Sequence, residues 1–266
     1  MAQFWDFLAS IVCALFGTCG QSDCRTVIHA NAAHTVCSFK TAEVTVRTHL
    51  KSKDGTPYRR LQVLEKSLSE APEDKPKKDR QTPAPEPIML MNGGMYHSDL
   101  GPVGLYIESG KRIKPISTKG GWGNFHLLPN GVFWMKDRRV GVTETKIYLT
   151  TRTKESAQPD FATQSGPMLV INGKLHPRFL KNSNSPKIRN GVGVAADGKT
   201  IHFAISQQAV TFHDFGTLFK DVLKAPNALY LDGTVSAIRA GSISQGGWRE
   251  LGPMISVTKR PNAARK

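Results

Sequence analysis

The chain has 266 residues, 39% of them hydrophobic, and a formal net charge of +15. A hydrophobic fraction of this size supplies a core, so the composition excludes a disordered chain. The excess of 36 Lys and Arg over 21 Asp and Glu favours either an anionic partner or a charged surface that keeps the protein soluble.

The first 20 residues have the pattern of a secretory leader. Residues 7–17 are almost all apolar, and small or polar residues follow up to Gly20. This run is too short to cross a bilayer comfortably. The segment lacks Lys and Arg and contains Asp6, which leaves an uncleaved anchor or a buried first helix as alternatives. We expect a signal peptide over residues 1–20 and export to the periplasm or the extracellular space.

The cysteines agree with export. All four lie within the first 37 residues, and Cys13 and Cys19 fall inside the leader. In an oxidising compartment the remaining pair, Cys24 and Cys37, would form one disulfide, and the alternative is two unpaired thiols. The absence of a Cys-x-x-Cys pair leaves no basis for a zinc or thioredoxin-like site. No metal and no cofactor is predicted.

Two segments define the N-terminal half. Residues 42–50 alternate, which predicts a half-buried strand with Ala42, Val44, Val46, Thr48 and Leu50 on its buried face and Glu43, Thr45, Arg47 and His49 on the other. Residues 72–87 combine five prolines with charged side chains, which predicts a solvated loop. We interpret this loop as an insertion in one domain, because too few residues precede it for an independent core.

Short apolar runs separated by turn sequences follow the loop. Strands are predicted at 88–91, 103–108, 125–128, 132–135, 168–171, 192–196, 200–206 and 228–231. Asn-Gly and Asp-Gly between such runs are typical of hairpins, since both turn residues need positive φ. Asp214 to Lys224 predicts a helix with an apolar face of Leu218, Phe219, Val222 and Leu223.

The predicted class is therefore α+β. We expect a single domain over residues 21–257, built mostly of antiparallel β-hairpins and mixed sheet with a few helices, and a basic tail over 258–266.

A tryptophan follows a glycine pair twice, in Gly120-Gly121-Trp122 and in Gly246-Gly247-Trp248. An exposed indole on such a loop would stack on a sugar ring. Because large aromatic side chains are usually mostly buried, the preferred interpretation is that each indole folds back to cap the core.

Four segments deliver polar residues and glycines to the end of an apolar strand. They are Asn92-Gly93-Gly94-Met95-Tyr96-His97, Gln164-Ser165-Gly166-Pro167, Arg189-Asn190-Gly191-Val192-Gly193 and Leu231-Asp232-Gly233-Thr234-Val235-Ser236. Glycines at such positions let the backbone approach a ligand and expose N–H donors. Each segment alone also fits an ordinary turn, but the four together indicate a site.

These segments, in this order, resemble the phosphodiester glycosidase family, whose type member is N-acetylglucosamine-1-phosphodiester alpha-N-acetylglucosaminidase, and in particular its uncharacterised bacterial branch. The resemblance runs from Cys24 to Val257 and includes the segments 102–108 and 228–233. It implies a hydrolase that cleaves a sugar-1-phosphodiester or a related anionic glycoside. One departure is that Gly233-Thr234-Val235-Ser236 stands where the family has a glycine-rich stretch.

The residue types suit this chemistry. A phosphate monoester is a good leaving group, so one carboxylate and one cation would suffice where an ordinary glycosidase uses two carboxylates. We predict Asp232 as the carboxylate, with an Asp-Gly turn as the alternative, and Arg189 as the cation that holds phosphate. Asn92 is grouped with them as catalytic. The predicted substrate-binding residues are Gly93, Gly94, Met95, Tyr96, His97, Gln164, Ser165, Gly166, Pro167, Asn190, Gly233 and Ser236.

Other functions find less support. The chain has no Gly-x-Ser-x-Gly, P-loop, His-Glu-x-x-His or EF-hand sequence. The second hypothesis is a non-catalytic module that binds anionic envelope polysaccharide through its basic stretches, Trp122 and Trp248. No nucleic-acid partner is predicted, since no recognition helix or aromatic sheet motif is present. The expected partner is an anionic carbohydrate or sugar phosphate, with association to an anionic cell envelope through the basic surface.

Overall fold

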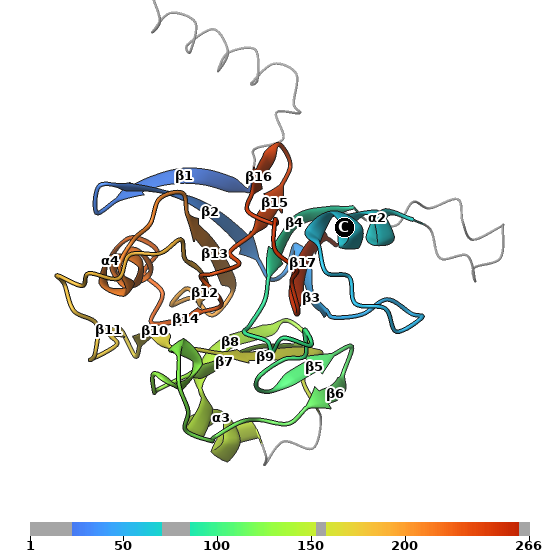
Figure 1. Cartoon of the computed structure of the whole chain (residues 1–266), viewed down its shortest axis with the longest axis horizontal. Helices are drawn as coiled ribbons and strands as arrows, with labels where there is room; N and C mark the ends of the chain where they lie inside the picture. Colours follow the sequence, from blue (N-terminus) through green and yellow to red (C-terminus); the bar gives the residue numbers. More distant parts are fainter. Residues whose placement is uncertain (1–22, 71–85, 153–157, 261–266) are drawn as a thin grey trace, which may run out of the picture.

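A computed structural model describes residues 23–70, 86–152 and 158–260 (Figure 1). The predicted leader, the tail beyond residue 260 and nearly all of the proline-rich loop lie outside the described residues. Within the described part of the chain, no helix is long and apolar enough to cross a membrane.

Three antiparallel sheets make up most of the structure. The first has the order β1 (Cys24–His29), β2 (Ala32–Lys40), β13 (Thr200–Ser206), β12 (Asn190–Val194), β14 (Asn227–Tyr230), β10 (Met168–Ile171) and β11 (Lys174–Leu175). The second is β16 (Ile243–Gln245), β15 (Ile238–Ala240), β4 (Pro87–Asn92), β17 (Met254–Lys259) and β3 (Val44–His49). The third is β6 (Lys111–Lys114), β5 (Tyr106–Glu108), β9 (Phe161–Ser165), β7 (Gly131–Lys136) and β8 (Arg139–Glu144).

Helices are few and short. They are α2 (Leu61–Ser69), α3 (Thr145–Arg152), α4 (Phe212–Thr217), the 3-10 turn η2 (Asn124–His126) and the π-helical turn η3 (Leu218–Val222). The predicted α+β class with mostly antiparallel strands is confirmed. The strand β17 runs to Lys259, two residues beyond the predicted end of the domain at 257.

The core joins all three sheets. Its largest cluster holds Phe39 and Phe203 from the first sheet, Met91 from the second and Phe133 from the third. The ring of Phe133 meets the ring of Phe203 edge-on, with 5.8 Å between centroids. A second cluster packs α4 and η3 against the first sheet. Because the three sheets share one core, residues at their strand ends are held in fixed relative positions.

Two predicted hairpins are confirmed with the expected backbone. Ser109 and Gly110 join β5 to β6 with φ of 49° and 74°, and Asn172 and Gly173 join β10 to β11 with φ of 47° and 78°. The predicted strand at 125–128 is wrong, because that segment contains η2. Both edges of β7, the strand it would have paired with, are taken by β8 and β9.

The predicted strand at 42–50 is β3, and Val44, Val46 and Thr48 are buried as expected. Ala42 is exposed instead, because β3 begins only at Val44. His49 is buried instead of exposed, because its outer face is covered by Tyr58 and its Nε2 bonds the Ser256 hydroxyl at 2.8 Å.

The predicted C-terminal helix begins earlier and ends differently. The Thr211 hydroxyl accepts a hydrogen bond from the Asp214 N–H, so the helix starts at Phe212. Its last turn is a π-turn closed by the Leu223 N–H and the Leu218 carbonyl. This wider turn rotates Val222 out of the apolar face, and Val222 is 40% exposed where burial was predicted.

The predicted disulfide is present. Cys24 of β1 lies opposite Cys37 of β2, and their sulfur atoms are bonded. The bridge ties the edge strand β1 to the rest of the first sheet, close to the first described residues.

Candidate active site

Strands of different sheets end near the centre of the molecule (Figure 1), and hydrogen bonds join polar side chains at these strand ends. Asn92 ends β4 of the second sheet, and Asn190 begins β12 of the first. Asp232 lies two residues beyond the end of β14. Ser165 ends β9 of the third sheet, and its hydroxyl donates to the Leu231 carbonyl at 2.6 Å. All three sheets therefore contribute to the position of Asp232.

Two buried asparagines link these segments. The Asn190 Nδ2 donates to the Asn92 Oδ1 at 2.8 Å, and the same oxygen accepts from the Ala237 N–H at 2.8 Å. The Asn190 Oδ1 accepts from the Asp232 N–H at 3.0 Å and from the Ser236 hydroxyl at 3.4 Å. This network fixes the backbone on both sides of the turn that carries Asp232. The network uses both polar side-chain atoms of Asn190, Nδ2 as a donor and Oδ1 as an acceptor.

The Asp232 carboxylate is partly buried and titrates unusually. Burial raises the pKa of Asp232 from 3.8 to about 6, although the Thr234 and Gly233 N–H groups favour its charged form. The exposed Asp197, in the hairpin turn before Gly198, behaves in the opposite way. The Thr200 hydroxyl and the Lys199 N–H lower the pKa of Asp197 below its ordinary value. Both carboxylates accept from the N–H two residues on, but burial dominates the pKa of Asp232 alone.

Arg189 lies beneath the surface and is only 2% exposed. Its Nε donates to the Val210 carbonyl at 2.8 Å and its Nη2 to the Ser185 carbonyl at 3.0 Å. The guanidinium carbon lies 3.6 Å from the ring centroid of Phe212. Its Nη1 is buried and has no hydrogen-bond partner in the described residues. No described carboxylate forms an ion pair with Arg189, so its positive charge is not neutralised by the protein there.

Tyr230 joins the two charged groups and was not among the predicted site residues. Its phenol interacts with Arg189, which stabilises the charged phenolate, and with Asp232, which opposes it. Burial dominates and raises the pKa of Tyr230 well above 10. A Cβ at Gly233 would collide with the Tyr230 hydroxyl, which explains the glycine after Asp232. The signal available in the sequence was a hydroxyl-bearing residue near the end of an otherwise apolar strand.

Tyr96, in the loop that follows β4, lies near Asp232. Its hydroxyl donates to the Glu250 carbonyl at 2.6 Å. Burial, followed by the charge of Asp232, raises the pKa of Tyr96 to about 12. The neighbouring Met95 packs against the cluster under α4, and His97 is exposed. This segment contributes a neutral phenol to the site.

The glycines of the first segment face protein at close range. The Gly93 N–H donates to the Pro253 carbonyl at 2.7 Å. A Cβ on Gly94 would lie 2.7 Å from the Gln164 carbonyl oxygen and from Thr163 Oγ1. The sequence predicted that the backbone at these glycines approaches a ligand. In the structure, the backbone of Gly94 approaches β9, and that of Gly93 approaches the loop before β17.

The Gln164 amide is fully engaged within the protein. Its Oε1 accepts from the Leu105 and Ser117 N–H groups at 2.9 Å each. Its Nε2 donates to the Ser117 carbonyl at 2.7 Å and to the Thr145 hydroxyl at 3.1 Å. Gln164 thus fastens the loop that follows β6 to the third sheet.

Gly166 and Pro167 support β14. A Cβ on Gly166 would lie 2.6 Å from Asn130 Cβ, and the Pro167 carbonyl accepts from the Tyr230 N–H at 3.1 Å. The segment after β9 therefore holds the strand that leads to Asp232.

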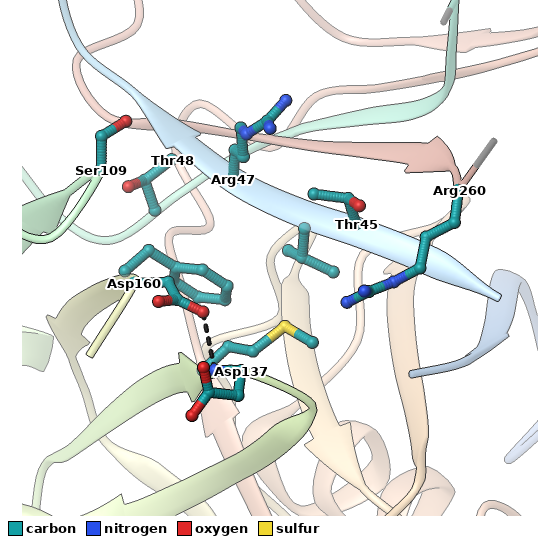
Figure 2. A pocket seen from close by; sticks show the side chains of 10 residues that line it. Thr45, Arg47, Thr48, Ser109, Asp137, Asp160 and Arg260 are labelled. Carbon is teal, nitrogen blue, oxygen red and sulfur yellow. Dashed lines mark hydrogen bonds between the residues drawn. The ribbon is translucent and has the colours of Figure 1, made fainter. Parts of the chain in front are cut away.

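A separate polar pocket of about 150 Å³ lies between β3 and the strands β7 and β9 (Figure 2). Its charged lining consists of Arg47, Asp137, Asp160 and Arg260. The Asp160 carboxylate accepts from the Asp137 N–H at 2.7 Å and thereby caps the β7–β8 turn. This volume is well below the roughly 300 Å³ at which small-molecule sites begin, so the pocket does not fit a disaccharide.

The preferred interpretation of the two glycine-flanked tryptophans is wrong. Trp122 is 98% exposed and Trp248 is 88% exposed, so neither caps the core. Gly123 has φ of 86°, and Gly246 and Gly247 have φ of 71° and 89°. These left-handed conformations occur in the loops that hold the indoles away from the protein.

Among the described residues, no group of three or more His, Cys, Asp and Glu side chains is close enough to hold a metal ion. The site thus consists of one carboxylate of raised pKa, two phenols, a buried guanidinium and a pair of amides. This set places a single carboxylate near a cation, within an antiparallel α+β fold.

Comparison with known proteins specifies the class. Residues 86–257 match the family model described as phosphodiester glycosidase. The chain belongs to the phosphodiester glycosidase family. The match includes Asn92, Arg189, Asn190 and Asp232.

A curated relative and two solved structures are similar to this chain. Uncharacterized protein YigE of Escherichia coli K12 is 43% identical over 176 residues, which are 65% of this chain and 66%, just under two thirds, of YigE. The catalytic domain of zebrafish N-acetylglucosamine-1-phosphodiester alpha-N-acetylglucosaminidase, auto-inhibited by its pro-peptide, gives a TM-score of 0.57 at 13% identity over 89% of this chain and 82% of that one. A hypothetical protein from Synechocystis gives 0.51 at 11% identity over 89% and 61%. The two structures establish likeness of fold.

Proposed function

We propose that this protein hydrolyses a sugar-1-phosphodiester, or a closely related anionic glycoside, at the anomeric carbon of the sugar. The observation that carries the proposal is Asp232, a carboxylate with a pKa of about 6 at the junction of three sheets. Membership of the phosphodiester glycosidase family supports it. The zebrafish enzyme with the same fold is named for the cleavage of an N-acetylglucosamine-1-phosphodiester.

In the proposed reaction, water attacks C1 of the sugar and the bond from C1 to the phosphate oxygen breaks. The phosphate monoester leaves with the electron pair of that bond. The Asp232 carboxylate accepts a proton from the attacking water and stabilises positive charge on the sugar ring. Because the leaving group is already a weak base, the reaction proceeds without a second carboxylate as general acid.

Arg189 is the proposed source of attraction for the phosphate. Its guanidinium has no carboxylate partner among the described residues, and Tyr230 lies beside it toward Asp232. Because Arg189 is buried, we propose that it attracts the phosphate through its positive charge and through the neighbouring Tyr230 hydroxyl. Its Nη1 is the one guanidinium nitrogen without a hydrogen-bond partner in the described residues. At an effective dielectric constant of 20, two unit charges about 4 Å apart attract by about 4 kcal/mol, which is an upper bound here.

Asn92, Asn190 and Ser236 are proposed as positioning residues. Their hydrogen bonds end on Asp232 or on the turn that follows it, and their polar atoms are buried. Holding a carboxylate in one place ahead of the reaction avoids the cost of reorganising it in the transition state. Tyr96 and Gly233 complete the walls around the carboxylate.

The pH profile tests the role of Asp232. We expect kcat/KM for a sugar-1-phosphodiester to rise with pH and to reach half its plateau near pH 6, because the base form of Asp232 is required and its pKa is about 6. The phosphodiester remains anionic throughout this range and does not contribute to the rise. The measurement is release of free sugar between about pH 4 and pH 8. Activity that falls from pH 5 to pH 7 would mean that the protonated carboxyl is the active form, contrary to the proposal.

We also propose that the enzyme works outside the cytoplasm. The disulfide between Cys24 and Cys37 supports an oxidising compartment, and the apolar segment at 7–17 supports export through a signal peptide. Association with an anionic envelope through the basic surface stays a prediction.

A further inference from the structure

Trp122 and Trp248 stand apart from the other aromatic side chains of the described chain. Trp134, by contrast, is 9% exposed, and its indole N–H donates to the Thr143 hydroxyl at 2.9 Å. Within the described residues, neither Trp122 nor Trp248 belongs to a hydrophobic cluster or has a ring partner. Burial of an indole would stabilise the fold about as much as burial of any other large aromatic side chain. Trp122 and Trp248 contribute no such stabilisation, because both are exposed.

The loop of Trp122 is anchored to the residue before the catalytic turn. The Asn124 side chain lies near the phenol of Tyr230 and favours its charged form, and Tyr230 in turn lies beside Arg189 and Asp232. The His126 ring bonds the Lys119 carbonyl at 3.0 Å and closes the loop around Gly121. Trp122 is two residues from Asn124, so its Cα lies within about 7 Å of the Asn124 Cα.

The loop of Trp248 lies against Ser236, which ends the turn that carries Asp232. Gly246 lies so close to the Ser236 carbonyl that a Cβ there would collide with it. Further along, the Tyr96 hydroxyl donates to the Glu250 carbonyl. Trp248 is two residues from Gly246, and the same limit of about 7 Å applies to their Cα atoms. Two separate loops that each carry an exposed indole therefore lie against opposite ends of the segment 230–236, which contains Asp232.

We propose that Trp122 and Trp248 are specificity residues that stack on sugar rings and hold an extended glycan across the Asp232 site. The inference rests on the proposed function, because the site it extends is the sugar-phosphodiester site. A flat indole matches the C–H face of a pyranose ring, and it binds that face without a charge or a fixed hydrogen bond. A substrate with a single sugar ring, held at the carboxylate, would not require contact with either indole. Two exposed indoles from separate loops fit a substrate in which further rings flank the one that is cleaved.

The occupant follows from what surrounds the indoles. An apolar protein partner would meet a broader hydrophobic patch. Trp122 instead stands between glycines with Lys119 and Asn124 nearby, and Trp248 stands between Gly247 and Arg249, which Glu250 follows. The Arg60 guanidinium contacts the Gly247 carbonyl, and Arg249 lies next to Trp248. Isolated aromatic faces beside positive charge suit a chain of sugars joined by phosphodiesters.

The test uses oligomers of N-acetylglucosamine 1-phosphate of increasing length and the full chain. For the unaltered protein we expect kcat/KM to rise with length by at least about tenfold, which corresponds to about 1.4 kcal/mol of added binding to the indoles, and then to level off. In the variant W122A/W248A this rise is expected to disappear, mainly through a higher KM. The variant W122Y/W248Y should keep part of the rise of kcat/KM with length. Ile28→Ala removes a 70% exposed side chain from β1 and serves as the matched control, with an unchanged length dependence.

Binding of the longest oligomer to D232N, measured by calorimetry with and without the two Trp→Ala changes, separates the two claims. Hydrolysis without any dependence on length, or equal dependence in W122A/W248A, overturns the inference and leaves the proposed function standing. Absence of hydrolysis, together with glycan binding that falls at least about tenfold in the tryptophan variant, supports the inference while the proposed function fails. A change of oligomeric state in W122A/W248A without loss of glycan binding would assign the indoles to a protein contact and overturn it.

Discussion

The substitution Asp232→Asn is expected to reduce hydrolysis of a sugar-1-phosphodiester by at least about 10³-fold. Asn keeps the size of the side chain and an oxygen that can accept from the Thr234 N–H, which Asp232 binds at 3.2 Å. It removes the base and the negative charge. Loss of a positioned general base alone costs about 10²- to 10⁴-fold, and loss of charge stabilisation adds to that.

The same substitution is expected to leave the fold at least as stable at neutral pH. The pKa of Asp232 rises from 3.8 to about 6 on folding, so the folded state binds the proton more tightly. Stability contributed by this group is therefore present at low pH and lost as pH rises through about 6. At about pH 7.5 the penalty is of order 2–3 kcal/mol, and Asn removes it. The variant should melt several degrees higher there, with the difference vanishing below about pH 4.

Asp197→Asn is the matched control for this result. Asp197 also precedes a glycine in a turn, but its pKa is lowered, so its charged form stabilises the fold above that pKa. We expect full activity and a slightly lower melting temperature. If D232N kept its activity, or D197N lost it, Asp232 would not be the catalytic carboxylate.

Asn190→Ala is expected to have the second largest effect, on stability as well as activity. It removes the donor to Asn92 and the acceptor for the Asp232 N–H and the Ser236 hydroxyl. These groups are buried, and leaving them without partners costs about 2–4 kcal/mol in total. The melting temperature should fall by about 5–15 °C. Because the Asp232 backbone is then released, kcat should fall by at least about tenfold at a temperature where the variant is folded.

Ser236→Ala is the milder companion of that variant. It removes the 2.7 Å bond from the Ser236 hydroxyl to the Asp232 carbonyl and leaves the Asn190 amide in place. About 1 kcal/mol of stability should be lost, with a smaller effect on kcat. An N190A protein with unaltered melting temperature and kcat would show that the amide network does not position Asp232.

Local patterns in the sequence were sufficient for part of the site. Asn92 and Asn190 lie at strand ends and Asp232 two residues beyond a strand. Strand ends are visible in a sequence as apolar runs that stop at polar residues and glycine. The structure brings these three together through hydrogen bonds. The hairpins at Ser109-Gly110 and Asn172-Gly173 were predictable for the same reason, since the turn residues alone determine their backbone.

What depends on distant packing could not be predicted in this way. Arg189 is enclosed by Phe212 and Tyr230, which come from α4 and β14, so nothing near Arg189 in the sequence indicates its burial. The Gln164 side chain, predicted to bind substrate, is occupied by Ser117 and Thr145 from segments far along the chain. The helices α2 and α3 were not predicted. α2 carries a short helical stripe of Leu61, Leu64 and Leu68 that could have been read from the sequence, whereas α3 has only eight residues and a weaker apolar face.

The central claim is attack at carbon, and isotope placement tests it most directly. The protein is incubated with a sugar-1-phosphodiester in ¹⁸O-labelled water, and the released phosphate monoester is examined by mass spectrometry. Cleavage of the C1–O bond places the solvent oxygen on the sugar, so we predict a phosphate monoester without ¹⁸O. The phosphate product is the reliable one to read, because free sugars exchange their anomeric oxygen with water. One ¹⁸O atom in the phosphate monoester would mean attack at phosphorus and would contradict a glycosidase mechanism built on Asp232.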